Sequence, residues 1–164
     1  MLIDLRNAED KDEAFLFRLF CSVHEPDFCF LGEVEKKVLL EMQFAAQQRH
    51  FRVNIPEARD KIVMLDGQPV GRICTAHRQQ ELHLVEIALL PEYRNRGIGS
   101  HLMKGLEREC EGEEMLPIRL QAHCGSPAIR FYQRHGFIII NDNDVYVVME
   151  NKLNDYNKIR KDYN

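Results

Sequence analysis

The residues from Arg94 to Gly99, which read Arg-Asn-Arg-Gly-Ile-Gly, have the types and spacing of a phosphate-binding turn. An apolar run at 82–90 precedes them, and a helix-like pattern follows them. A glycine turn at the start of a helix leaves several backbone N–H groups unpaired and pointing the same way. The helix dipole adds partial positive charge there, and the two arginines add full charges. Such a turn can bind a phosphate or pyrophosphate group.

Other phosphate-binding motifs fit this stretch less well. The Walker pattern is absent, and a dinucleotide fingerprint would need Gly or Ala at position 102, where the chain has Leu102. The helix that follows the turn is amphipathic, because apolar side chains recur at every fourth residue, at Ile98, Leu102, Leu106 and Cys110. The context of a buried strand, a glycine turn and a helix therefore supports the phosphate interpretation.

Two polar residues, His83 and Glu86, interrupt the apolar strand before the turn. Strand alternation places His83 on one face with Val85, Ile87 and Leu89, and Glu86 on the other face with Leu84 and Ala88. A polar side chain inside so apolar a strand needs a hydrogen-bond partner or a function. Each residue is a candidate general base, and the alternative for each is a hydrogen-bonded structural role.

The elements that position these residues follow from hydrophobic periodicity and turn residues. We predict strands at residues 2–6, 61–65, 70–77, 82–90 and 118–122, and a final hairpin of 137–140 and 145–149. We predict helices from Glu9 to before Pro26, at 33–49, from Ile98 to Glu111, and from Ser126 to Gly136. The first helix should bury Phe15, Leu16, Leu19, Phe20 and Val23, and the second Val34, Val38, Leu39, Met42, Phe44 and Ala45.

Two connections carry specific predictions. Asp66-Gly67 should form a tight hairpin turn, which Gln68-Pro69 could lengthen. The chain leaves the central strand at residue 90 and returns at 118 through a helix, so these two strands should be parallel. In the short helix after the second of them, Ser126 should be the N-cap and Pro127 the first helical residue.

Composition is that of an ordinary globular protein: 164 residues, 45% hydrophobic and 29% charged, with a formal net charge of −4. The negative charge argues against a nucleic-acid partner.

No apolar run has transmembrane length, and Met1 to Asp4 lacks a signal pattern, so we expect no membrane partner and a cytoplasmic location. The five cysteines suggest reduced thiols, and no four-ligand spacing predicts a metal.

Two motifs resemble those of the GNAT superfamily of N-acetyltransferases. Residues 82–103 resemble its acyl-CoA-binding motif. Residues 126–137 resemble its closing motif, N-x-x-A-x-x-F-Y-x-x-x-G-F, with matches at Ala128, Phe131, Tyr132, Gly136 and Phe137. Ser126 replaces the usual Asn. The likeness is good from Lys61 to Glu150, whereas the N-terminal helices agree only in general layout.

The resemblance implies a single α/β domain at residues 1–150, followed by a polar tail at 151–164. The sheet should be mixed and mostly antiparallel, with a central parallel pair that splays apart to admit the pantetheine arm, and with helices on both faces. The cosubstrate would be acetyl-CoA, and the backbone around Leu89 would pair with its pantetheine. The cofactor-binding residues implied are Ile87, Ala88, Leu89, Arg94, Asn95, Arg96, Gly97, Ile98, Gly99, Ser100, Ser126, Phe131 and Tyr132.

The same resemblance implies the catalytic residues. Tyr132 would protonate the leaving thiolate, and Glu86 or His83 would accept the proton of the amine, with Glu86 favoured because a carboxylate also attracts a cationic amine. The expected reaction is transfer of an acetyl group to an amine by direct attack in a ternary complex. The acceptor could be a small molecule or a protein amino group, and a homodimer is compatible with the sequence. The alternative is a non-catalytic acyl-CoA sensor or interaction module.

Overall fold

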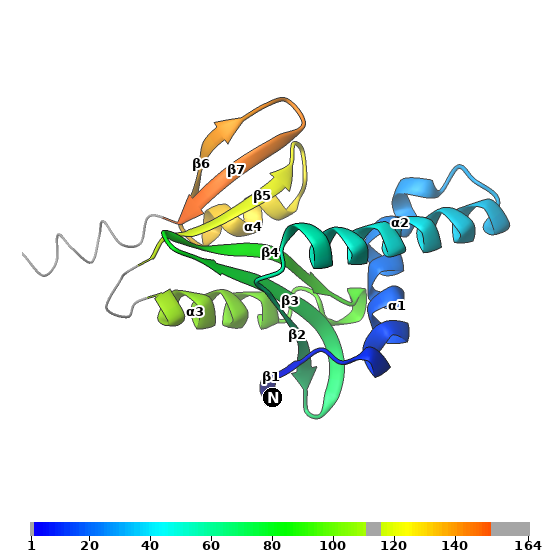
Figure 1. The fold of residues 1–164 in the computed structure, drawn as a ribbon, viewed down its shortest axis with the longest axis horizontal. Coiled ribbons are helices and arrows are strands. Elements are labelled where there is room, and N and C mark those ends of the chain that lie inside the picture. The colour runs from blue at the N-terminus through cyan, green and yellow to red at the C-terminus, as the bar shows by residue number, and fades with distance from the viewer. Residues whose placement is uncertain (1, 111–115, 152–164) are drawn as a thin grey trace, which may run out of the picture. The chain divides into compact units, whose positions relative to one another are not determined.

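The computed structural model describes residues 2–110 and 116–151, whose strands form one mixed sheet of seven (Figure 1). The strands lie in the order β1-β2-β3-β4-β5-β7-β6. Their bounds are β1 Ile3–Asn7, β2 Ala58–Leu65, β3 Gln68–Arg78, β4 Glu81–Leu89, β5 Ile118–His123, β6 Phe137–Asp142 and β7 Tyr146–Asn151. The α-helices are α1 Glu13–His24, α2 Glu33–Asn54, α3 Ile98–Cys110 and α4 Ala128–Arg134.

The predicted parallel pair is confirmed. β4 and β5 run in the same direction, with residues 82–84 opposite residues 118–120. The pairs β1–β2, β2–β3, β5–β7 and β6–β7 are antiparallel. Parallel strands need a long crossover between them, and α3 lies in this connection. The fold is therefore the mixed, mostly antiparallel α/β architecture that the sequence predicts.

The chain divides into two compact units. The first contains the described residues up to Ala76 and Glu86–Gly99, and the second contains His77–Val85 and the described residues from Ser100 onward. Strands β1 and β2 and helices α1 and α2 thus belong to the first unit, whereas β5, β6, β7 and α4 belong to the second. The residues predicted to form the site occur in both units, Glu86 to Gly99 in the first and His83, Ser100 and Tyr132 in the second.

The turn between β2 and β3 has the two residues predicted for it. Asp66 and Gly67 have φ values of +48° and +81°, and Leu65 pairs directly with Gln68. Two successive residues with positive φ give a turn whose twist matches that of the flanking strands, which explains the Asp-Gly sequence. Gln68 and Pro69 belong to β3 and do not lengthen the loop.

The start of the first helix follows the predicted acidic run, but it is a short 3-10 turn, Asp10–Asp12, that leads into α1. The Asp12 side chain is buried and accepts hydrogen bonds from both Arg6 Nη atoms, at 2.7 and 2.6 Å, and from the Glu9 amide at 2.9 Å. The bond to Arg6 lowers the pKa of Asp12 to about 2. This carboxylate therefore stabilises the helix start.

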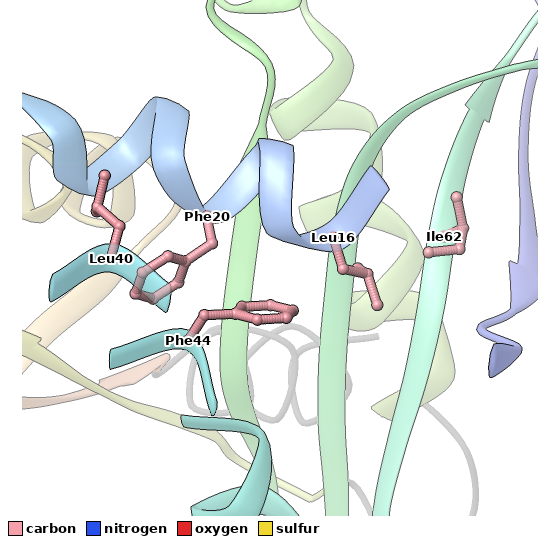
Figure 2. Packing of buried hydrophobic residues seen from close by; sticks show 5 residues of the cluster. All are labelled: Leu16, Phe20, Leu40, Phe44 and Ile62. Atoms are coloured by element: carbon pink, nitrogen blue, oxygen red, sulfur yellow. The ribbon is translucent and has the colours of Figure 1, made fainter. Parts of the chain in front are cut away.

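A hydrophobic cluster joins α1 and α2 to the sheet of the first unit. It consists of Leu16 and Phe20 of α1, Leu40 and Phe44 of α2, and Ile62 of β2 (Figure 2). Figure 2 shows the Phe20 and Phe44 side chains between the two helices, and their ring centroids are 5.5 Å apart. Ile62 is fully buried, so the face of β2 that carries it is the one packed against these helices.

The predicted buried face of the second helix is partly wrong. Val34, Val38 and Met42 are 75%, 50% and 63% exposed, and Ala45 is also exposed, whereas Leu40 and Phe44 are buried. The helix has one apolar stripe at 34, 38 and 42 and another at 40 and 44, and periodicity alone does not say which one packs. Contact with Leu16, Phe20 and Ile62 selects the second stripe.

Three further details differ from the predictions. Helix α2 continues to Asn54, beyond the predicted end at Arg49. Val23, predicted to be buried, is 41% exposed at the end of α1, before a 3-10 turn that contains Pro26. Asn151, predicted to begin the polar tail, is the buried last residue of β7, and residues 152–164 of the tail lie outside the described residues. Within the described residues, no helix combines the length and apolar character needed to span a membrane.

Candidate active site

The predicted phosphate-binding turn lies between β4 and α3. A short 3-10 turn, Pro91–Tyr93, follows β4, and the chain then passes through Arg94 to Gly97 into the helix at Ile98. Asn95 and Gly97 have positive φ values, +58° and +81°. Asn and Gly are the residues that adopt this conformation most readily. The turn is exposed, whereas Ile98 is fully buried and anchors the start of α3.

The amide groups of the first turn of α3 belong to Ile98, Gly99 and Ser100 and have no partners within the helix. They occur directly after two exposed arginines whose side chains are both held in place. Arg94 Nε donates a hydrogen bond to the Leu89 carbonyl oxygen at 2.8 Å. The Arg96 guanidinium lies over the Tyr93 ring, 5.7 Å from its centroid. The local geometry is thus that of an anion-binding helix start with ordered positive charge.

A glycine that the sequence analysis did not single out holds the end of β4 close to β3. At Gly71 an added Cβ would lie 2.4 Å from the Ala88 carbonyl oxygen and 2.5 Å from a methyl group of Leu89. The Leu90 amide donates a hydrogen bond to the Val70 carbonyl oxygen at 2.9 Å. A glycine inside a strand is a sign of such close backbone approach. Gly71 therefore fixes the position of Ala88 and Leu89, two of the residues predicted to bind the cofactor.

We expect Gly71→Ala to destabilise the protein by about 1–3 kcal/mol, the usual cost of overpacking a well-packed interior. The added methyl group would overlap backbone, which cannot move aside as a flexible side chain can. Urea denaturation measures the change in the free energy of unfolding. Gly105→Ala is the matched control, because nothing lies within 4 Å of a Cβ at Gly105 in α3. Equal stability of the Gly71→Ala variant and the wild type would show that β3 and β4 can separate without cost.

Glu86 makes two side-chain hydrogen bonds within the first unit. Its Oε2 accepts a hydrogen bond from Arg72 Nη1 at 2.8 Å, and its Oε1 lies 3.4 Å from Gln47 Nε2. The Glu86 side chain is 22% exposed. Burial raises the pKa of Glu86, and the positive charge of Arg72 opposes this rise. A carboxylate with a raised pKa is a stronger base than an ordinary one, which suits proton transfer from an amine.

His83 has a different environment, in the second unit. Its ring Nδ1 lies 3.7 Å from Glu81 Oε1, and the side chain is 21% exposed. Glu81 also accepts a hydrogen bond from Arg119 Nη1 at 3.0 Å, and Arg119 Nε donates to Glu150 at 2.6 Å. His83 thus adjoins a network of ion pairs across β4, β5 and β7. This network gives His83 a structural explanation that does not require catalysis.

Tyr132 is buried in the second unit, with 9% of its surface exposed. Its ring centroid lies 5.5 Å from that of Phe131 and 5.8 Å from that of Phe137. Phe131 in turn lies 4.8 Å from the His135 ring. His135 Nε2 is 3.1 Å from the hydroxyl of Ser100, a predicted phosphate ligand in the first turn of α3. His135, a residue that the sequence analysis missed, therefore contacts both Phe131 and Ser100.

The start of α4 is shifted by one residue from the prediction. The helix begins at Ala128 with Pro127 in the N-cap position, whereas Ser126 was expected as the cap. The Ser126 hydroxyl accepts a hydrogen bond from the Ala128 amide at 3.3 Å, so it still satisfies a free amide at the helix start. Gly136, with φ of +79°, follows the helix as predicted.

Comparisons with known proteins identify the family and the fold. The sequence profile of the acetyltransferase (GNAT) family matches residues 23–137. The fold is similar to that of the PaiA N-acetyltransferase of Thermoplasma acidophilum in complex with coenzyme A. The TM-score is 0.71 and the identity 20%, over 93% of this chain and 99% of that chain. No curated protein sequence matches the chain significantly.

Two further solved structures share the fold. One is the spermidine N-acetyltransferase SpeG chimera from Vibrio cholerae and hSSAT, with TM-score 0.63 and 15% identity over 96% of this chain and 99% of that chain. The other is an Arabidopsis thaliana protein in complex with the bisubstrate analogue CoA-Ac-MVNAL, with TM-score 0.62 and 17% identity over 93% of this chain and 100% of that chain. The family profile spans most of the chain and includes both the glycine turn and α4, so the chain belongs to the acetyltransferase (GNAT) family.

Proposed function

We propose that this protein transfers the acetyl group of acetyl-CoA to an amine by direct attack in a ternary complex. The observation that carries the proposal is the turn from Arg94 to Gly97, which leads with positive φ at Asn95 and Gly97 into the start of α3. The complexes of PaiA with coenzyme A and of the Arabidopsis protein with a CoA-containing analogue support acetyl-CoA as the cosubstrate. The acetyltransferase domain would comprise residues 1–150, and the five free cysteines fit a cytoplasmic location.

Each residue of the proposed site would have a distinct role. The free amides at the start of α3, together with Arg94 and Arg96, would hold the pyrophosphate of acetyl-CoA. The backbone from Ile87 to Leu89 would pair with the pantetheine arm. The Leu89 carbonyl oxygen already accepts the Arg94 hydrogen bond, but a carbonyl can accept a second one. Ser100, Ser126 and Phe131 complete the proposed cofactor contacts.

The chemistry requires the nitrogen to lose two protons and the sulfur to gain one. Glu86 would remove a proton from the ammonium form of the acceptor, so that the nitrogen lone pair can attack the thioester carbon. Carbon–nitrogen bond formation and carbon–sulfur bond cleavage then release the thiolate of coenzyme A, which Tyr132 would protonate. The nitrogen loses its second proton to solvent, and solvent returns a proton to Tyr132. The transfers to Glu86 and from Tyr132 are general acid–base catalysis by positioned side chains. The acceptor would be a small-molecule amine or a protein amino group. The SpeG chimera, a spermidine N-acetyltransferase, supports the first choice, and the peptide-like part of CoA-Ac-MVNAL supports the second.

A thiol-release assay with acetyl-CoA and a broad panel of amines tests this proposal. We expect release of coenzyme A that depends on one class of amine and exceeds the hydrolysis background. Binding of acetyl-CoA without release of thiol above that background, for every amine, would instead identify a non-catalytic acyl-CoA sensor.

We expect Glu86→Gln to lower the rate more than His83→Gln and to alter the acidic limb of the pH–rate profile. The amide keeps the shape of Glu86 but cannot accept a proton. Because burial raises the pKa of Glu86, the active, deprotonated form should be lost at a higher pH than for an ordinary carboxylate. Rates over a pH series for the wild type and both variants provide the measurement. An acidic limb that moves only in His83→Gln would assign the base to His83.

A further inference from the structure

Three charged residues form a cluster across neighbouring strands of the first unit: Asp60 on β2, Arg72 on β3 and Glu86 on β4. Arg72 Nε and Nη2 both donate to the Asp60 carboxylate at 2.7 Å, and Nη1 donates to Glu86 Oε2 at 2.8 Å. The Arg72 side chain is 4% exposed, whereas the side chains of Asp60 and Glu86 are 29% and 22% exposed. Two carboxylates thus share one buried cation, and the excess negative charge lies on the more accessible side of the cluster.

Gln47 of α2 completes this cluster and leaves one polar atom without a partner. Its Nε2 faces Glu86 Oε1 at 3.4 Å, and its Oε1 is buried and finds no hydrogen-bond donor among the described residues. Reversal of the amide would not help, because it would place the amide oxygen against the carboxylate oxygen of Glu86. A buried acceptor without a donor is unfavourable, and a ligand that supplies an N–H group would remove this cost.

The other groups around Glu86 do not provide the missing donor. The Phe51 ring covers Arg72, with the guanidinium 5.0 Å from its centroid. Cys74, two residues after Arg72 on β3, is a buried thiol whose pKa burial raises to about 12, so it stays neutral. His24 of α1 contributes positive charge when protonated, but it pairs with Asp27 at 3.6 Å. Among the described residues, Gln47 Oε1 therefore remains an acceptor without a donor, next to two carboxylates that share one cation.

We propose that Gln47 is a specificity-determining residue, whose side-chain oxygen accepts a hydrogen bond from the ammonium form of the acceptor while Glu86 Oε1 accepts another. This inference rests on the proposed function and names two further residues of the site, Gln47 and Arg72. Arg72 is a positioning residue, because its bond to Oε2 fixes the carboxylate, whose Oε1 accepts from Gln47 Nε2 and has a second lone pair for the ligand. The ammonium nitrogen then loses one proton to Glu86, which becomes a neutral carboxylic acid, and the resulting amine attacks the thioester.

The test compares benzylamine, which is protonated at neutral pH, with aniline, which has a similar size and is neutral. We expect Gln47→Met to raise the KM for benzylamine about tenfold or more, since hydrogen bonds to charged groups are the stronger ones. The KM for aniline and for acetyl-CoA should not change. Gln47→Glu is the matched control, because it restores an oxygen acceptor and should recover benzylamine recognition. For each amine, the KM of the variant is divided by the KM of the wild type. This ratio removes the difference in intrinsic reactivity between the two amines.

Binding without turnover separates this inference from the proposed function. NMR titration of each amine into the protein saturated with coenzyme A should show tighter binding of benzylamine than of aniline, and the preference should be lost in Gln47→Met. Equal behaviour of the two amines in the wild type, or an equal effect of Gln47→Met on both, overturns the inference. Thiol release that is absent with every amine would refute the proposed catalysis, whereas the titration would still report on ammonium recognition.

Arg72→Lys tests the positioning role. Lysine keeps the positive charge but lacks the planar group that bridges both carboxylates. Burial is the main cause of the raised pKa of Glu86, and the positive charge at position 72 opposes this rise. The lysine would oppose it less well than Arg72 does. We expect the acidic limb of kcat/KM for benzylamine to move to higher pH, with a higher KM for benzylamine and an unchanged KM for acetyl-CoA. An unchanged pH profile in a folded variant would make Arg72 merely structural.

Discussion

Replacement of Gly99 by valine is expected to weaken coenzyme A binding by about two orders of magnitude or more and to leave the fold largely intact. Gly99 lies in the first turn of α3, where unpaired amides face the proposed pyrophosphate. A branched side chain there would prevent close approach of phosphate oxygens to these amides. Each hydrogen bond to a charged group is worth about 1.5–3 kcal/mol, so loss of two such bonds accounts for the expected change.

The fold should tolerate the change because Gly99 has helical backbone geometry without a positive φ, which a valine can adopt. Gly105→Val is the matched control, since it introduces the same side chain into the same helix at a position with open space around it. Calorimetric titration with coenzyme A gives both affinities, and thermal melting confirms that each variant is folded. If the folded Gly99→Val variant bound coenzyme A as the wild type does, the turn would not be the cofactor site.

Local sequence signals predicted the parts of this fold that depend on neighbouring residues. Asp66-Gly67 identified the β2–β3 turn because positive φ at two successive residues is a property of the turn itself. The four-residue spacing from Ile98 to Cys110 identified α3, whose buried residues include Ile98, Leu102 and Leu106. Both features are complete within a short window of the chain, so periodicity and turn chemistry were sufficient.

The surroundings of Glu86 could not be predicted in the same way. Asp60, Arg72 and Gln47 come from two other strands and a helix, and only the registers of β2 and β3 and the packing of α2 bring them to Glu86. A signal was present, because Arg72 is a lone charge in the apolar strand at 70–77 and must have a partner there. The identity of that partner depends on the fold.

The buried face of α2 shows the same limit. Two apolar stripes compete on a helix whose sequence is mostly polar, and α1 and β2 decide between them. Gly71 is a further example. This position must be glycine because Ala88 and Leu89 on β4 approach it closely and leave no space for a side chain. Residues whose role is set by a distant segment were therefore missed, although the residue types themselves gave hints.

Tyr132→Phe is expected to lower turnover about 100-fold while acetyl-CoA affinity stays nearly unchanged, because general-acid groups typically contribute about 10²–10⁴-fold. The Tyr132 ring packs against Phe131 and Phe137, and phenylalanine preserves these contacts. Only the hydroxyl is lost, and its proton matters as the carbon–sulfur bond breaks. A group that acts mainly in the transition state affects turnover more than ground-state binding. The thiolate is already a fair leaving group, which argues for the lower end of the range.

The experiment needs cofactor affinity by titration and turnover with an amine that the enzyme acetylates. Tyr146→Phe is the matched control, because it removes a hydroxyl from a partly buried ring on β7 that has no proposed catalytic role. The centroid of the Tyr146 ring lies 4.3 Å from that of the His123 ring. Turnover should fall in Tyr132→Phe alone. Since removal of the acid leaves the thiolate to be protonated by water, residual activity should not recover at higher pH, where protons are scarcer. Full turnover of the Tyr132→Phe variant would assign Tyr132 to core packing, the role that its burial and helical spacing would suggest by themselves.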